Sequence, residues 1–229
     1  MGTITAGVAL LSLCAIVATG CAERRAEDSH SVFLFSGEQA KGAAPQTGAA
    51  SDSNSTNTSP ASVLFVVYVA TPPDVVDVML KTARVTRDDV LCDLGCGDGR
   101  IVVTAAKRYG CRAVGYDLDP LRVQEARKNA EDNHVAHRVR IEQKDILEAD
   151  LSGATVVTLY LGHQLNARLV PRLAKLGAGA RIVSHDFPLA DIPPDQVVHV
   201  TSRTDRRVHT VYLWNCPLKV ANPRPTPTP

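Results

Sequence analysis

The sequence predicts an α/β fold, a doubly wound and mostly parallel sheet with an antiparallel hairpin at its C-terminal end. Three observations support this prediction. Short β-rich apolar runs alternate with helical segments between residues 63 and 217, a glycine-rich turn joins one strand to the next helix, and the final strands follow each other too closely for a helical crossover. Alternation of this kind builds right-handed βαβ units and therefore a parallel sheet covered by helices on both faces.

The individual elements follow from apolar periodicity and from the positions of proline and glycine. A first helix is expected after an apolar run, with Thr71 as its N-cap, Pro72 as its first residue and Asp74 completing a capping box. Further helices are expected at 100–109, 120–133 and 165–176. Strands are expected at 63–69, 89–94, 112–117, 139–143, 155–161 and 181–185.

The C-terminal part departs from the alternation. About ten residues, including Pro188, Pro193 and Pro194, separate the strand at 181–185 from the next apolar run, whereas a parallel crossover needs roughly a dozen or more. We therefore expect strands at 197–201 and 208–214 to form an antiparallel hairpin.

The chain is predicted to have four parts. Residues 1–25 are expected to be a signal or anchor segment, 26–62 a flexible low-complexity linker, 63–217 the folded domain and 218–229 a disordered proline-rich tail. Residues 3–22 carry no charge and match the length of a minimal membrane-spanning helix, about 17–25 residues.

Two membrane arrangements are compatible with the first segment. Arg24 and Arg25 follow the apolar block, which favours an anchor with the domain facing the cytoplasm. The stretch Val-Ala-Thr-Gly-Cys ending at Cys21 resembles a bacterial lipobox, so an exported lipoprotein lipidated at Cys21 is the alternative.

Composition excludes some functions. The 25 basic and 24 acidic side chains give a net charge of +1, so there is no electrostatic argument for a nucleic-acid partner. The six cysteines show no regular spacing, and Cys92 and Cys96 are too few to ligate zinc by themselves. We expect neither a disulfide framework nor a metal site, and nothing indicates an oligomeric state.

The stretch Val-Leu-Cys-Asp-Leu-Gly-Cys-Gly-Asp-Gly-Arg at 90–100 has the chemistry of a nucleotide site. Glycines between a strand and a helix allow a tight turn and close ligand approach in Rossmann-like folds. The G-x-G-x-G spacing differs from the G-x-G-x-x-G of pyrophosphate-binding cofactors. The flanking Asp93 and Asp98 would repel a pyrophosphate and suit a ligand carrying a positive amine and a sulfonium.

Two further carboxylates are expected at the same edge of the sheet. Asp117 ends the next strand, close to the roughly 20-residue offset at which an acidic group meets a ribose diol. Asp145 follows the third strand and is placed to accept a proton from an adenine amino group.

Together these residues resemble a class I S-adenosylmethionine-dependent methyltransferase. The segments at 68–72, 93–101, 157–161, 181–187 and 211–214 are similar to the ATP synthase c-subunit and adenine nucleotide translocase lysine methyltransferase family and its bacterial relatives. The resemblance covers residues 67–217. Ala70 departs from it, standing where a proline is expected in the Tyr-Val-Pro-Thr-Pro element.

The resemblance implies S-adenosylmethionine as cofactor and in-line methyl transfer to a deprotonated lysine amine of a protein substrate, which can be membrane-embedded. It implies these cofactor-binding residues: Asp93, Gly95, Cys96, Gly97, Gly99, Asp117, Leu118, Asp145 and Ile146. Tyr160 and His185, at strand ends, are the candidate catalytic residues, and Tyr68 is placed to close over the cofactor. Each histidine is equally consistent with a structural role.

Two alternatives stay open. One is a small-molecule or lipid methyltransferase with the same cofactor site, and the other is a non-catalytic cofactor-binding module tethered to a membrane. The strand at 155–161 lacks the Asp/Asn-Pro-Pro-Tyr signature of enzymes that methylate planar amide or base nitrogens, which counts against those acceptors.

Overall fold

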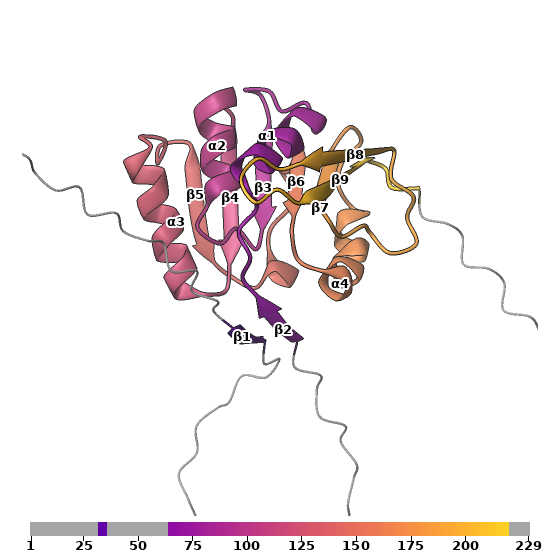
Figure 1. The fold of residues 1–229 in the computed structure, drawn as a ribbon, viewed down its shortest axis with the longest axis horizontal. Helices are drawn as coiled ribbons and strands as arrows, with labels where there is room; N and C mark the ends of the chain where they lie inside the picture. The colour runs from indigo at the N-terminus through magenta and orange to yellow at the C-terminus, as the bar shows by residue number, and fades with distance from the viewer. Residues whose placement is uncertain (1–31, 36–63, 220–229) are drawn as a thin grey trace, which may run out of the picture.

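The computed structural model describes residues 32–35 and 64–219 and confirms the doubly wound sheet (Figure 1). Its main strands are β3 (Val90–Leu94), β4 (Arg112–Asp117), β5 (Val139–Gln143), β6 (Val156–Leu159), β7 (Arg181–His185), β8 (Gln196–Thr201) and β9 (Val208–Asn215). They form one sheet in the order β5-β4-β3-β6-β7-β9-β8. The order reverses on the two sides of β3, which places a ligand-binding crevice at the carboxyl end of that strand.

Pairing directions match the sequence-based prediction. β3 pairs in parallel with both β4 and β6, and β5 and β7 extend the parallel sheet outward. β9 runs antiparallel to both β7 and β8, so the predicted C-terminal hairpin is confirmed. Because β9 inserts between β7 and β8, the last strand within residues 64–219 lies inside the sheet.

Helices cover the two faces of the sheet separately. Three helices, α1 (Pro73–Thr82), α2 (Arg100–Tyr109) and α3 (Pro120–Asp132), share one core cluster. A second cluster holds α4 (His163–Leu173) and the short 3-10 turn η1 (Ile146–Glu148). Alternate residues of β3 divide between them: Leu91 packs in the first cluster, and Cys92 and Leu94 in the second. This period of two is why the strand reads as a continuous apolar run.

The predicted capping box of α1 is wrong. Pro72 is the N-cap, and no side chain caps the helix. Thr71 instead lies 3.1 Å, Oγ1 to Nδ1, from His185. Asp74 accepts hydrogen bonds from the hydroxyl of Ser202 at 3.0 Å and from the backbone N–H of Arg203 at 2.6 Å. The side chains of Thr71 and Asp74 therefore bond to residues far away in the sequence and do not cap the helix.

Some of the described residues lie outside the predicted bounds of the folded domain. β1 (Val32–Phe35) pairs antiparallel with β2 (Leu64–Val67) in a separate two-stranded sheet, although 26–62 is predicted to be a linker. Its sequence, Val-Phe-Leu-Phe, has the β-propensity to pair. At the other end Lys219 Nζ lies 2.6 Å from Asp195 Oδ1, two residues past the expected domain boundary.

The rest of the predicted signal or anchor segment, linker and tail lies outside the described residues. Within residues 32–35 and 64–219, none of the helices has the length and apolar character needed to cross a bilayer.

The turn into α2 depends on a close approach to α3. Gly99 is the N-cap of α2, with φ 76°. A Cβ atom there would lie 2.9 Å from Cβ and 3.1 Å from Cα of Ala126 in the middle of α3. The side chain of Asn129 also donates to the carbonyl oxygen of Asp98 at 2.9 Å. The helix packing itself therefore excludes a side chain at Gly99.

Substituting Gly99 by alanine should lower the free energy of unfolding by more than backbone strain alone would. Gly179 provides the matched control, because it has φ 84° and a Cβ atom added to it would meet no other atom within 4 Å. We expect Gly179→Ala to lower the free energy of unfolding by about 1–2 kcal/mol from the left-handed backbone. Gly99→Ala should lose about 1–3 kcal/mol more from overpacking. Urea unfolding of both variants measures the difference, and equal losses would contradict the packing argument.

Candidate active site

A pocket opens at the carboxyl ends of β3, β4 and β6, the edge that the sequence predicts. Its wall combines the segment before α1, the glycine turn, the start of α3 and the end of β6. The lining residues are Tyr68, Val69, Ala70, Thr71, Asp93, Gly95, Cys96, Asp98, Arg100, Ile101, Asp117, Leu118, Asp119, Arg122, Ile146, Tyr160, Leu161 and Leu165.

Asp93 supplies a buried carboxylate to this wall. Its side chain lies on β3, and Oδ1 accepts a hydrogen bond from the hydroxyl of Thr158 on β6 at 2.7 Å. Oδ2 is buried and has no hydrogen-bond partner among the described residues. Burial raises the pKa of Asp93 to about 7, and the nearby charges of Asp117 and Asp98 act in the same direction. An unpartnered buried carboxylate oxygen is costly, so it fits a ligand that brings a positive donor such as an amine.

The glycine turn is shaped by protein atoms on both sides. The N–H of Gly97 donates to Asp117 Oδ2 at 2.8 Å. A Cβ on Gly97 would lie 2.3 Å from Cε2 of Tyr68, and the residue has φ 54°. The guanidinium of Arg122 lies over the Tyr68 ring in a cation–π contact, with its Cζ 4.0 Å from the ring centroid. Gly97 thus lets Tyr68 lie directly over the turn, where its ring forms part of the pocket wall.

Asp98 does not provide the free negative charge expected from the sequence. Its carboxylate forms a two-pronged ion pair with Arg100, with Nη2–Oδ2 at 2.6 Å and Nε–Oδ1 at 2.9 Å. Arg100 Nη1 also donates to the backbone oxygen of Thr71 at 2.9 Å. The pair therefore joins the glycine turn to the segment before α1, and the other acidic side chains of the pocket wall are Asp93, Asp117 and Asp119.

The other predicted cofactor residues divide into two groups. Gly95, Cys96, Asp117, Leu118 and Ile146 lie in the pocket wall with Asp93. Asp117 accepts the N–H of Gly97 and, at 3.0 Å, that of Asp119, and burial raises its pKa. Outside the wall lie Gly97, Gly99 and Asp145. Asp145 caps η1 by accepting the N–H of Leu147 at 2.8 Å, which directs its neighbour Ile146 into the pocket.

The two candidate catalytic residues occupy different positions. Tyr160 lines the pocket, and its ring centroid lies 3.9 Å from that of His185. His185 is fully buried behind the wall and contacts the pocket residues Thr71 and Tyr160. Burial lowers the pKa of His185 to about 4, so the imidazole is neutral near pH 7.

Some lining residues are not among the site residues predicted from the sequence. Arg122, in the first turn of α3, and Thr71 are buried parts of the wall. Leu161 contributes the atom nearest to Gly95, where a Cβ would lie 2.6 Å from Leu161 Cδ2. These contacts join segments far apart in the chain, and local spacing does not encode them. Proline at the start of α3 located the helix but not the role of its arginine.

Comparisons with known proteins agree with this geometry. Residues 93–196 match the family model described as the ANTKMT methyltransferase domain. A protein-lysine N-methyltransferase of Saccharolobus islandicus is 44% identical over 154 residues, which are 66% of this chain and 94% of that protein. The adenine nucleotide translocase lysine N-methyltransferase of Mus musculus is 37% identical over 137 residues, covering 59% of this chain and 59% of the relative.

A solved structure is similar as well. The crystal structure of an RNA methyltransferase from Salinibacter ruber in complex with S-adenosyl-L-homocysteine is 47% identical, with a TM-score of 0.62, and the match covers 67% of this chain and 97% of that one. The relatives and the pocket with its unpartnered carboxylate point to the same cofactor. The chain therefore belongs to the S-adenosylmethionine-dependent methyltransferases, in the ANTKMT-related family that includes protein-lysine N-methyltransferases.

Proposed function

We propose that the protein methylates the side-chain nitrogen of lysine in a protein substrate. The observation that carries the proposal is the similarity to the Saccharolobus protein-lysine N-methyltransferase over nearly all of that protein. The pocket supports it, since Tyr160, Leu161 and Leu165 form an aromatic and apolar part of the wall. An aliphatic stem ending in a nitrogen suits such a surface.

The residues present fit the cofactor. Asp93 Oδ2 would accept the ammonium group, Asp117 would meet the ribose hydroxyls, and Leu118 and Ile146 would flank the adenine. When bound, S-adenosylmethionine supplies a methyl group on a positively charged sulfur. The pairing of one charged group with Asp93 removes the cost of the buried, unpartnered oxygen.

The protein has two tasks toward the acceptor. A lysine amine has a reference pKa of about 10.4, and burial among Tyr160, Leu161 and Leu165 favours its neutral, nucleophilic form. The rigid ends of β3 and β6 must also hold the amine in line with the transferred group, because correct positioning supplies much of the rate acceleration in reactions of this kind. The buried Asp93–Thr158 hydrogen bond connects these two strand ends.

RNA is the second candidate substrate, because the similar Salinibacter structure is described as an RNA methyltransferase. The balanced charge of this chain, 25 basic against 24 acidic side chains, favours a protein acceptor. A small molecule or a lipid in the same pocket is the remaining alternative.

Transfer of label from S-adenosylmethionine should identify the acceptor. We expect the full-length protein, incubated with extract of the source cells and tritiated cofactor, to label material that protease destroys and ribonuclease leaves intact. Mass spectrometry should then find methyl-lysine. Label that ribonuclease removes, or that extracts with lipid, would contradict the lysine proposal. The Asp93→Asn protein serves as the inactive control.

Cofactor binding should weaken as the pH falls through about 7. The carboxyl of Asp93 has a raised pKa of about 7 in the free protein, so below that pH it must lose a proton before it can pair with an ammonium group. We expect the Kd of S-adenosylmethionine, measured by calorimetry, to rise up to about tenfold for each pH unit below 7.

Two variants test the assignment of this pH dependence. Asp93→Asn should bind roughly 100-fold more weakly at pH 8, as expected for the loss of a buried charge-assisted bond, and its affinity should vary little with pH. Asp88→Asn changes an exposed aspartate on the surface and should behave as wild type. A pH profile that Asp93→Asn leaves unchanged would assign the titration to another group.

The membrane arrangement expected from residues 1–25 is also a proposal. An anchor with the domain facing the cytoplasm would keep the enzyme with a cofactor made in the cytosol. Protease added to intact cells or spheroplasts should then leave the domain uncut, whereas digestion from outside would favour the lipoprotein alternative.

A further inference from the structure

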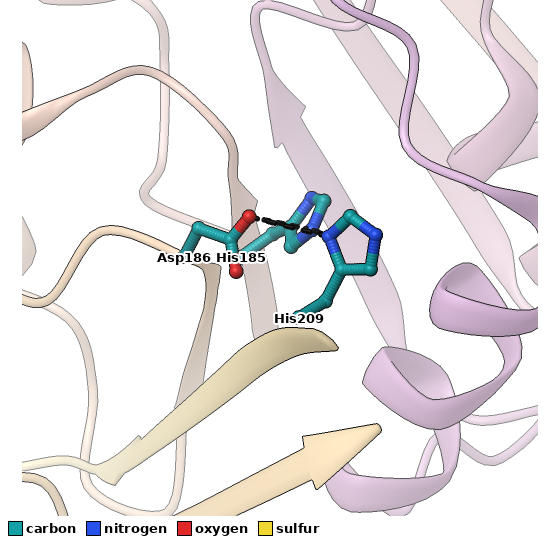
Figure 2. A group of neighbouring side chains, drawn as sticks. All are labelled: His185, Asp186 and His209. Carbon is teal, nitrogen blue, oxygen red and sulfur yellow. Dashed lines mark hydrogen bonds and ion pairs between the residues drawn. The ribbon is translucent and has the colours of Figure 1, made fainter. Parts of the chain in front are cut away.

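Three side chains outside the pocket wall converge where β7 ends and β9 begins (Figure 2). His185 ends β7, Asp186 follows it, and His209 is the second residue of β9. His185 is fully buried, His209 is 6% exposed and the Asp186 side chain is 31% exposed. Their nearest atoms form a triangle with edges of 2.9 Å (His185 Nε2–His209 Nδ1), 3.3 Å (His185 Nε2–Asp186 Oδ2) and 3.3 Å (His209 Nδ1–Asp186 Oδ2).

Each of the three side chains is held from outside by a second contact. The other ring nitrogen of His185, Nδ1, lies 3.1 Å from Thr71 Oγ1. The other nitrogen of His209, Nε2, lies 3.0 Å from Asp205 Oδ2. The other oxygen of Asp186, Oδ1, accepts the N–H of Thr210 at 2.7 Å. The three remaining atoms, His185 Nε2, His209 Nδ1 and Asp186 Oδ2, lie within 3.3 Å of one another.

The three neighbouring atoms offer more lone pairs than hydrogens. His209 Nε2 faces a carboxylate and so carries its hydrogen there, which leaves Nδ1 of a neutral ring with a lone pair. Asp186 Oδ2 adds a charged acceptor, and only His185 Nε2 can bring a hydrogen. Two of the distances, at 3.3 Å, exceed the usual range of about 2.7–3.2 Å for an N–H···O bond.

The two 3.3 Å edges match the spacing of ligand atoms around a tetrahedral ion. The 2.9 Å edge between the two imidazoles has the length of a hydrogen bond, so an ion would move these two nitrogens slightly apart. Bonds of about 2.0–2.1 Å from zinc to imidazole nitrogen and carboxylate oxygen separate neighbouring ligand atoms by about 3.3–3.4 Å. A histidine ligand also characteristically donates its second N–H to a carboxylate, as His209 does to Asp205.

We propose that His185, Asp186 and His209 form a binding site for a divalent transition-metal ion, with zinc the best match. Asp205 and Thr71 are its outer supports, and the partly exposed Asp186 leaves the fourth position on the solvent side. The ion would join the end of β7 to β9 and, through Thr71, to the pocket wall. Its role is to stiffen that wall and does not depend on the identity of the methyl acceptor.

Calorimetric titration of the full chain, made without a histidine tag and stripped with a chelator, tests the proposal with zinc alone. We expect one ion per chain at the cluster and a rise in Tm on zinc addition. His209→Gln should weaken zinc binding at least 100-fold and abolish the rise in Tm. Asp205→Asn, which keeps all three ligands, should weaken binding about 10–100-fold.

His199→Gln is the matched control, since His199 is an exposed histidine on β8 that lies outside the cluster and contacts the hydroxyl of Thr210 at 3.2 Å. It should bind zinc as wild type does. Retained binding of S-adenosylmethionine would show that His209→Gln is folded. Absence of zinc binding to wild type, or equal affinity in wild type and His209→Gln, would overturn the proposal.

A second measurement needs no variant. Cobalt(II) added to the stripped wild-type protein should give the intense visible absorption of a tetrahedral nitrogen and oxygen site, and zinc should displace it. A weak spectrum like that of the hydrated ion would mean that the two imidazoles are simply hydrogen-bonded to each other.

Discussion

The site depends first on the turn between β3 and α2, where three glycines have neighbours that leave no room for a side chain. Gly95 meets Leu161, Gly97 meets Tyr68, and Gly99 meets α3, each at a distance that a Cβ atom would violate. The turn therefore does more than admit a ligand. It brings the segment before α1, the end of β6 and the middle of α3 close together, and the first two of these segments contribute Tyr68, Thr71, Tyr160 and Leu161 to the pocket wall.

The acidic side chains at this edge of the sheet differ in whether a positive partner balances their charge. The ion pair with Arg100 balances Asp98, whereas Asp93 remains buried with one oxygen unpartnered and Asp117 is held by backbone N–H groups. The free protein thus carries the cost of desolvated acidic groups in the place where the cofactor brings positive charge. The pocket therefore favours a cationic ligand, because only a positive group removes the free-energy cost of the buried carboxylates.

The C-terminal hairpin connects the methyl-transfer pocket to the rest of the molecule. β9 returns between β7 and β8, which brings His209 beside His185 and places Asp74 against the hairpin turn at Ser202. The wall residue Thr71 contacts both Arg100 and His185, so it is shared by the glycine turn and by the histidine cluster. A change at the hairpin can therefore reach the pocket without touching the cofactor.

Local patterns predicted the succession of strands and α-helices along the chain from β2 to β9, and the bounds of α2, β4, β5 and β7 agree with those expected. Periodicity and glycine spacing are properties of adjacent residues, and they also located Asp93 and Asp117 at one edge of a parallel sheet. Only the tertiary structure paired Asp98 with Arg100, diverted Thr71 from its cap and made Asp145 the cap of η1. It alone brought His185 to His209, 24 residues away, because contacts between strands follow their register, which spacing along the chain does not specify.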